Sequence, residues 1–118
     1  MKIMTEELTI ALKYVVGKED PDRGYYPGGV QDPLALEELQ VWVERSQRFS
    51  YQSKSFSECE GYQIHIGGSR RSLFELGRYL IALSRYHTSD RSYHDHLDEI
   101  GEVAGKERCE IIIHGPKN

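Results

Sequence analysis

Three stretches of the chain alternate apolar and polar residues, and side chains two residues apart lie on the same face of a β-strand. The first is residues 7–16, ELTIALKYVV. The second is residues 36–47, LEELQVWVERSQ, and the third is residues 61–69, GYQIHIGGS. Each stretch is therefore predicted to form a strand with one buried face. Because polar and aromatic residues follow the second stretch, we expect a bend or bulge near residues 46–52.

A longer period marks residues 69–87, SRRSLFELGRYLIALSRYH, in which leucines recur three or four residues apart. This spacing predicts one long amphipathic helix over residues 69–87 that lies on a sheet. Ser69 is a good N-cap residue because its hydroxyl can accept a hydrogen bond from a free amide of the first turn. The predicted buried stripe is Leu73, Leu76, Leu80 and Leu83, with Gly77 allowing close packing.

Two further short strands are expected after the helix, at YHDHLDEI (residues 93–100) and RCEIIIHG (residues 108–115). Several strands with a single helix favour the α+β class. We therefore predict one domain over residues 1–118, with a mostly antiparallel sheet of four to six strands and the helix packed on one face. Residues 16–33 hold three of the four prolines and are predicted to form a surface loop.

Composition narrows the class of protein. The chain is 38% hydrophobic and 29% charged, which is typical of a soluble globular protein. No apolar run approaches the roughly 20 residues that span a bilayer, and Glu6 and Glu7 interrupt the N-terminal segment, which argues against a signal peptide. The net charge of −4 argues against general nucleic-acid binding and suits a basic partner.

Cysteine usage agrees with a cytoplasmic protein. Cys59 and Cys109 are far apart in the sequence and form no CxxC motif. Two such thiols are typical of a reducing compartment. A disulfide between them stays open if their strands are neighbours.

The segment SYHDHLDEIG, residues 92–101, carries the most specific candidate chemistry. On a strand, one face takes His94, His96 and Asp98, and the other takes Tyr93, Asp95 and Leu97. Two imidazoles and a carboxylate are suitable ligands for a divalent metal, with His65 or His114 as a further ligand. A catalytic role for the histidines and an ordinary polar strand face are the alternatives, and we favour the polar face.

The junction IGGSRRS, residues 66–72, suggests anion binding through the free amides of a helix N-terminus, helped by Arg70 and Arg71. Its spacing matches neither a phosphate loop nor a dinucleotide loop. A strand, a glycine turn and a capping serine explain the same residues without a ligand.

The run IHIGGSRRSLFELGRYLIALS, followed by an HxHLD segment and CEIIIH, resembles a group of small α+β immunity proteins encoded beside bacterial polymorphic toxins. The resemblance covers roughly residues 61–114. It implies a cytoplasmic protein that binds and neutralises a cognate toxin, without catalysis and without a cofactor. The candidate contact residues are aromatic and acidic groups of the kind that dominate interfaces: Tyr25, Tyr26, Glu37, Glu38, Trp42, Glu44 and Tyr51.

Two other functions stay open. One is a small metal-binding protein or metal-dependent enzyme that uses His94, His96 and Asp98. The other is a self-associating α+β protein, a homodimer formed through a sheet face. No membrane partner is expected in any of these cases.

Overall fold

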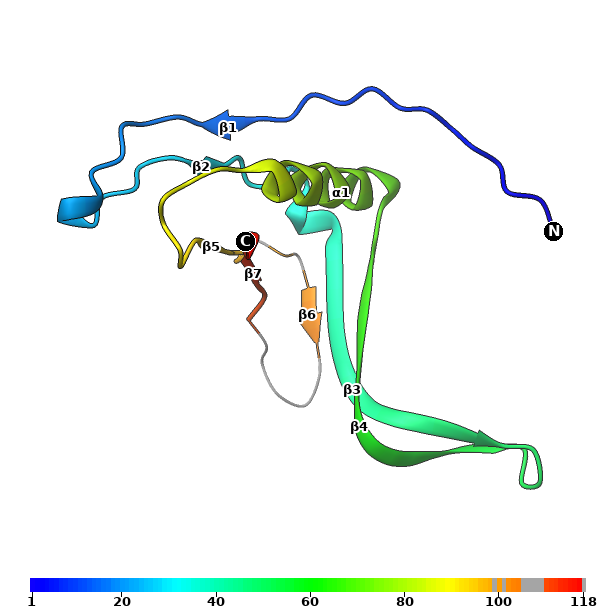
Figure 1. Cartoon of the computed structure of the whole chain (residues 1–118). Helices are drawn as coiled ribbons and strands as arrows, with labels where there is room; N and C mark the ends of the chain where they lie inside the picture. The colour runs from blue at the N-terminus through cyan, green and yellow to red at the C-terminus, as the bar shows by residue number, and fades with distance from the viewer. Residues whose placement is uncertain (99, 101, 105–109, 118) are drawn as a thin grey trace.

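The computed structural model describes residues 1–98, 100, 102–104 and 110–117. Within these residues the chain belongs to the α+β class, as predicted, with one α-helix, α1 (Arg70–Arg85), and three small sheets (Figure 1). The prediction of one sheet of four to six strands is wrong in this respect. The strands instead divide into small groups around the helix.

The largest sheet is built on a long antiparallel hairpin of β3 (Leu39–Ser50) and β4 (Ser55–Gly68). A short strand, β6 (Glu102–Ala104), pairs in parallel with the start of β3. The pairing of β3 with β4 shifts between Arg45 and Gln47, which confirms the expected bulge. Gly61, with a φ of 95°, lies in the part of β4 opposite this shift and permits a backbone conformation that other residues rarely adopt.

The other two sheets are short antiparallel pairs. β1 (Tyr14–Val15) pairs with β2 (Gly29–Val30), and β5 (His94–His96) pairs with β7 (Ile112–His114). Only the last part of the predicted strand 7–16 is therefore a strand. Alternation indicates which face is apolar, but a strand also needs a partner strand. Lys13 still accepts a backbone hydrogen bond of 3.1 Å from Gln31, whereas residues 7–12 pair with no strand of the described chain.

The predicted loop, residues 16–33, contains regular structure. Pairing of β1 with β2 closes it, and it contains a short 3-10 helix, η1 (Pro21–Arg23). Asp20 and Tyr25 exchange backbone hydrogen bonds of 2.8 and 3.0 Å across this turn. A second 3-10 helix, η2 (Leu36–Glu38), leads directly into β3.

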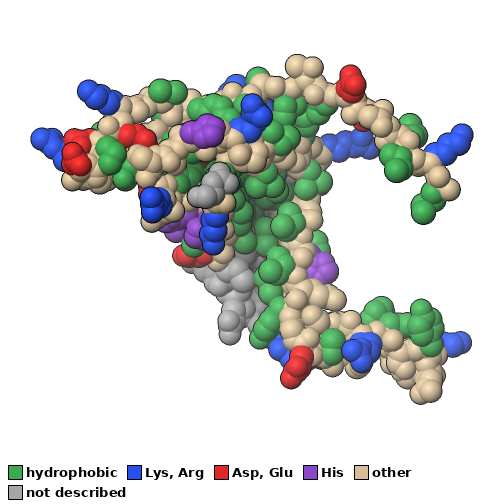
Figure 2. All heavy atoms as spheres, in the orientation of Figure 1, with side chains coloured by type: hydrophobic (Ala, Val, Ile, Leu, Met, Phe, Trp, Pro, Cys, Tyr) green, Lys and Arg blue, Asp and Glu red, His purple; other side chains and the backbone are tan. Residues whose placement is uncertain are grey.

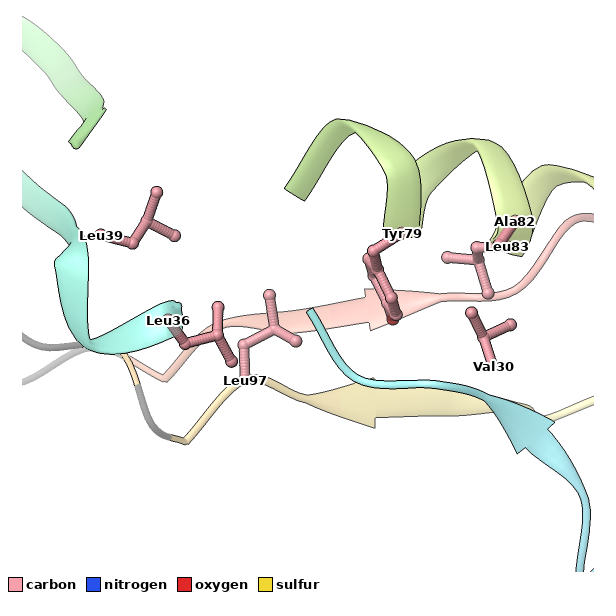
Figure 3. Packing of buried hydrophobic residues seen from close by; sticks show 7 residues of the cluster. All are labelled: Val30, Leu36, Leu39, Tyr79, Ala82, Leu83 and Leu97. Atoms are coloured by element: carbon pink, nitrogen blue, oxygen red, sulfur yellow. The ribbon is translucent and has the colours of Figure 1, made fainter. Parts of the chain in front are cut away.

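A small core lies between the helix and the strands that approach it from below in Figure 3. Residues from η2, β2, α1 and the segments beside them supply its buried side chains: Val30, Leu36, Leu39, Tyr79, Ala82, Leu83 and Leu97. Full burial of a leucine side chain contributes roughly 2 kcal/mol. This cluster therefore holds α1 to the start of the long hairpin.

The N-terminus of α1 follows the prediction, because the amide of Ser72 donates to Ser69 Oγ at 3.0 Å. The predicted buried stripe is half wrong. Leu76 and Leu83 pack on the core, whereas Leu73 and Leu80 are 45% and 43% exposed. No described atom outside the helix's own backbone lies within 4 Å of a Cβ added at Gly77, so among the described residues this glycine has no close packing contact.

The reason is that the helix has a second apolar stripe. Leu73, Phe74, Leu80 and Ile81 lie about half a turn away from Tyr79 and Ala82, which occupy the face toward the core. Leucine spacing alone does not show which of two apolar stripes is covered.

The chain extends well beyond this core (Figures 1 and 2). Its radius of gyration is 18.6 Å, whereas a compact chain of this length has about 13.5 Å. The N-terminal segment and the distal part of the β3–β4 hairpin both extend toward the right of Figure 1, the first at the top of the view and the second at the bottom. No helix in the described part of the chain is long and apolar enough to cross a bilayer.

Cys59 lies half-buried on β4. The start of the predicted strand 108–115 lies outside the described residues, and so does Cys109. The disulfide considered from the sequence stays a prediction.

Candidate functional site

The two-stranded sheet of β5 and β7 gathers three imidazoles on one exposed side. His94 lies opposite His114 in the strand register. Its ring centroid is 5.1 Å from that of His96 and 5.7 Å from that of His114. The Nδ1 atom of His94 is 2.7 Å from the carbonyl oxygen of Ser92, which fixes the orientation of this ring.

The metal-binding alternative, His94, His96 and Asp98, does not lie together on this sheet. β5 ends at His96, so Asp98 lies in a turn and not on the strand. His65 lies on the separate long hairpin. Among the residues that the structure describes, no group of three or more histidine, cysteine, aspartate or glutamate side chains is arranged to hold a metal ion.

The opposite side of β5 faces the helix, as the strand period predicts for Tyr93, Asp95 and Leu97. Asp95 Oδ2 accepts hydrogen bonds from the hydroxyls of Tyr79, at 2.6 Å, and Tyr93, at 3.1 Å. The Tyr93 hydroxyl also accepts a bond of 2.9 Å from the amide of Val30. Asp95 on β5 is thereby bonded directly to α1, and to β2 through the Tyr93 hydroxyl.

The two hydroxyls in this network stay protonated over the ordinary pH range. Burial raises the pKa of Tyr93 to about 12, and the nearby charge of Asp95 adds to the shift. Burial, and then the hydrogen bond to Asp95, raise the pKa of Tyr79 further still. Both groups therefore act as hydrogen-bond donors, and the arrangement suits a structural role for Asp95.

A pair of stacked rings, Trp42 and His65, lies on one face of the long hairpin and is called the platform below. Trp42 and His65 are paired across β3 and β4, and their rings stack with centroids 4.9 Å apart and planes 1° apart. His65 Nε2 lies 2.8 Å from Glu44 Oε1, so the carboxylate orients the imidazole. A Cβ at Gly67 would lie 3.6 Å from the Trp42 ring, which is an ordinary van der Waals contact.

Two of the predicted contact residues, Trp42 and Glu44, thus share a face and a common neighbour. His65 was not predicted to join them. The position of His65 follows from the hairpin register, which sets residue 65 opposite residue 42. Predicting that register from the sequence would require knowing where the hairpin turn falls.

Glu38 has a local role at the start of α1. Ser69 Oγ donates to Glu38 Oε1 at 2.8 Å, and Arg71 Nη1 lies 3.6 Å from Glu38 Oε2. A carboxylate is favourable beside a helix N-terminus, where the backbone amides carry partial positive charge. The chain's own Glu38 therefore supplies the negative charge that the sequence suggested an anion would bring. Its neighbour Glu37 is exposed.

The predicted tyrosines lie in two other places. Tyr25 is exposed and Tyr26 half-buried beside η1, whereas Tyr51 is at the turn of the long hairpin and is 87% exposed. The predicted contact residues therefore do not form one continuous site. They divide between the loop, the platform face and the hairpin turn.

Tyr51 belongs to an aromatic cluster that the sequence analysis did not identify. The Phe49 ring meets Tyr51 edge-on at 5.0 Å and lies tilted against Phe56 at 5.0 Å. Phe49 and Phe56 are directly paired across the strands. Figure 2 shows hydrophobic side chains gathered at the end of the projecting hairpin.

No protein-family model matches the chain, no curated protein is significantly similar to it in sequence, and no solved structure is significantly similar to it in fold.

Proposed function

We propose that this chain is a protein-binding module and that its contact surface is the distal hairpin, residues 45–61. The observation that carries this proposal is the aromatic cluster of Phe49, Tyr51 and Phe56. All three side chains are exposed, although they belong to the residue types that contribute most to burial. None of them belongs to the core cluster of the described residues.

The physical setting of the distal hairpin supports a binding role. A two-stranded hairpin without a third strand or a covering helix is at best marginally stable in water. When a partner removes an exposed aromatic group of such an element from water, the free energy of the system falls, which favours binding. Tryptophan, tyrosine and arginine are the most frequent hot spots of interfaces, and the distal hairpin carries Tyr51, Arg45 and Arg48.

The resemblance to immunity proteins narrows the partner to a cognate bacterial toxin. A chain with a net charge of −4 favours association with a basic toxin, because opposite charges speed encounter. The distal hairpin itself has mixed charge: Arg45, Arg48, Lys54, Glu58 and Glu60. Electrostatic attraction therefore comes from the acidic residues outside it, and the aromatic cluster supplies the contact.

The test is co-expression with the product of the neighbouring toxin gene, followed by titration of the two purified proteins. We expect the wild-type chain to restore growth of the toxin-producing cells. Tyr51→Ala and Phe56→Ala should each raise the Kd by about tenfold or more, the effect of a hot-spot residue. Val16→Ala, at an equally exposed apolar residue outside the distal hairpin, is the matched control and should leave the Kd unchanged.

Two results would separate the parts of this proposal. Failure of the wild-type chain to protect the cells or bind the toxin would remove the toxin as partner. Tight binding that Tyr51→Ala and Phe56→Ala leave unchanged would remove the distal hairpin as the contact surface.

A further inference from the structure

β4 has an unpaired backbone edge beside exposed apolar side chains. In the three-stranded sheet the order is β4–β3–β6, so no described strand covers the outer side of β4. Tyr62, Ile64 and Ile66 lie on one face of this strand, and Ile64 is 68% exposed. This surface is separate from the aromatic cluster, because it lies on the other side of the bulge.

The bulge opposite Gly61 lies at one end of this edge, and beyond it, over residues 62–68, the edge lacks the other features that usually prevent strand pairing. Natural edge strands are protected by proline, by lysine or other inward-pointing charges, or by being short. Residues 60–68, EGYQIHIGG, contain no proline and no lysine. Glu60 and His65 are their only acidic or basic residues, and β4 as a whole is 14 residues long.

We propose that a second copy of this chain pairs with β4 along this edge, antiparallel and across a two-fold axis at Ile64. In this register Ile64 faces Ile64 of the partner subunit, and Tyr62 faces the partner subunit's Ile66. His65 then faces the partner subunit's Gln63, and Glu60 faces the partner subunit's Gly68. Apolar residues meet apolar residues, and no two like charges are opposed.

Registers displaced by four residues in either direction are less favourable. An axis at Tyr62 places Ile64 opposite the partner subunit's Glu60, which sets an apolar side chain against a carboxylate. An axis at Ile66 shortens the pairing, because β4 ends at Gly68. The self-complementary order of residues 62, 64 and 66 therefore selects another copy of the same strand as the occupant.

The exposed area of the chain supports an assembly of this kind. The accessible surface is 9919 Å², whereas a compact monomer of this mass exposes roughly 6,600 Å². A standard stable interface covers about 800 Å² on each partner. The excess is several times that area, so burying β4 in a dimer still leaves the distal hairpin exposed for a different protein.

The first test is the mass of the purified protein in solution, measured by light scattering and sedimentation over a range of concentrations. We expect a dimer, with twice the 13.6 kDa mass of one chain. Ile64→Lys should give a monomer, because two ammonium groups would meet at the axis. Ile112→Lys, the same change at an exposed strand residue on β7, is the matched control and should stay dimeric.

The second test fixes the register by cross-linking, in a variant whose two native cysteines are replaced by serine. Ile64→Cys should form a disulfide-linked dimer under mild oxidation, because directly opposed Cα atoms lie within about 6 Å. Tyr62→Cys should not, because its copy is displaced by four residues, or about 13 Å along the strand. The absorbance and circular dichroism of each variant would show that it is folded.

Three outcomes would overturn the inference: a monomer at every concentration, a dimer that Ile64→Lys leaves intact, or cross-linking through Tyr62→Cys in place of Ile64→Cys. These measurements use the chain alone. Their failure is therefore distinct from failure of the toxin-binding proposal, which depends on the distal hairpin.

Discussion

Two apolar residues that face each other across the long hairpin have opposite environments. Val41 on β3 is 2% exposed, whereas Ile66, its partner on β4, is 58% exposed. Their side chains lie on the same face of the same sheet. β6 lies beside β3 at this point, but no described strand lies on the outer side of β4. Burial is thus set by the neighbours of a strand and not by its alternation.

The helix repeats this contrast. Tyr79 and Leu83 are buried against the core, and Phe74 and Ile81 on the other side remain exposed. Both faces are apolar in sequence. The side of α1 that faces the core, and β3 beside it, are packed as in an ordinary protein interior. The other side of α1 and the outer part of β4 expose apolar residues of the kind that a partner molecule would bury.

The largest expected effect tests this difference within one helix. Leu83→Ala should lower the free energy of unfolding by about 2–5 kcal/mol, because it leaves a cavity in the core. Leu80→Ala, on the exposed side of the same helix, should change it by no more than about 0.5 kcal/mol. Urea denaturation of the two variants measures both values. Equal losses would mean that the two helix faces are equally covered in solution, and the contrast would fail.

Much of the fold could be predicted from periodicity and capping. The strand period placed Leu39, Val41 and Val43 on one face, and Ser69 marked the first turn of the helix. Both follow from interactions between residues close in sequence. The division into three sheets could not be predicted, because it depends on which strand edges meet in space.

The candidate site shows the same limit. The strand period correctly placed Asp95 on the face opposite His94 and His96, but nothing in the local pattern indicated that two tyrosine hydroxyls would meet Asp95. Tyr79 is 16 residues away on a different element. The platform of Trp42 and His65 likewise depends on pairing between residues that are 23 positions apart in the sequence, and one shift in register would separate the rings.

A smaller effect is expected from the hydrogen bond between Tyr79 and Asp95, which joins α1 to β5. Tyr79→Phe removes the hydrogen bond to Asp95 and should lower the free energy of unfolding by about 1.5–3 kcal/mol, as for bonds to a charged group. Tyr25→Phe, at an exposed tyrosine, is the matched control and should change it by less than about 0.5 kcal/mol. Thermal or urea unfolding near pH 7 gives both values. Similar losses in the two variants would show that the Asp95 network contributes nothing particular.

The same network makes stability depend on alkaline pH. The pKa of Tyr93 rises from its ordinary value of 10.0 to about 12 on folding, because the buried phenol loses water. The stabilisation of the protonated form is fully present below pH 10 and is lost as the pH rises toward 12. The unfolding midpoint in urea should therefore fall over this range, and it should fall less steeply in Tyr93→Phe. An unchanged slope in that variant would assign the loss to other groups.

The smallest expected effect concerns the exposed side of the helix directly. Gly77→Ala should raise the free energy of unfolding by about 0.5–1 kcal/mol, because alanine is the better helix former and its Cβ would meet nothing within 4 Å. Gly68→Ala is the opposite case, since its Cβ would come within 2.9 Å of the Glu38 carbonyl oxygen and would also meet Ser72. Urea unfolding should thus show a higher free energy of unfolding in Gly77→Ala and a lower one in Gly68→Ala. A loss in Gly77→Ala would mean that another chain packs closely on this face in solution, which would extend the self-association inferred for β4 to the helix.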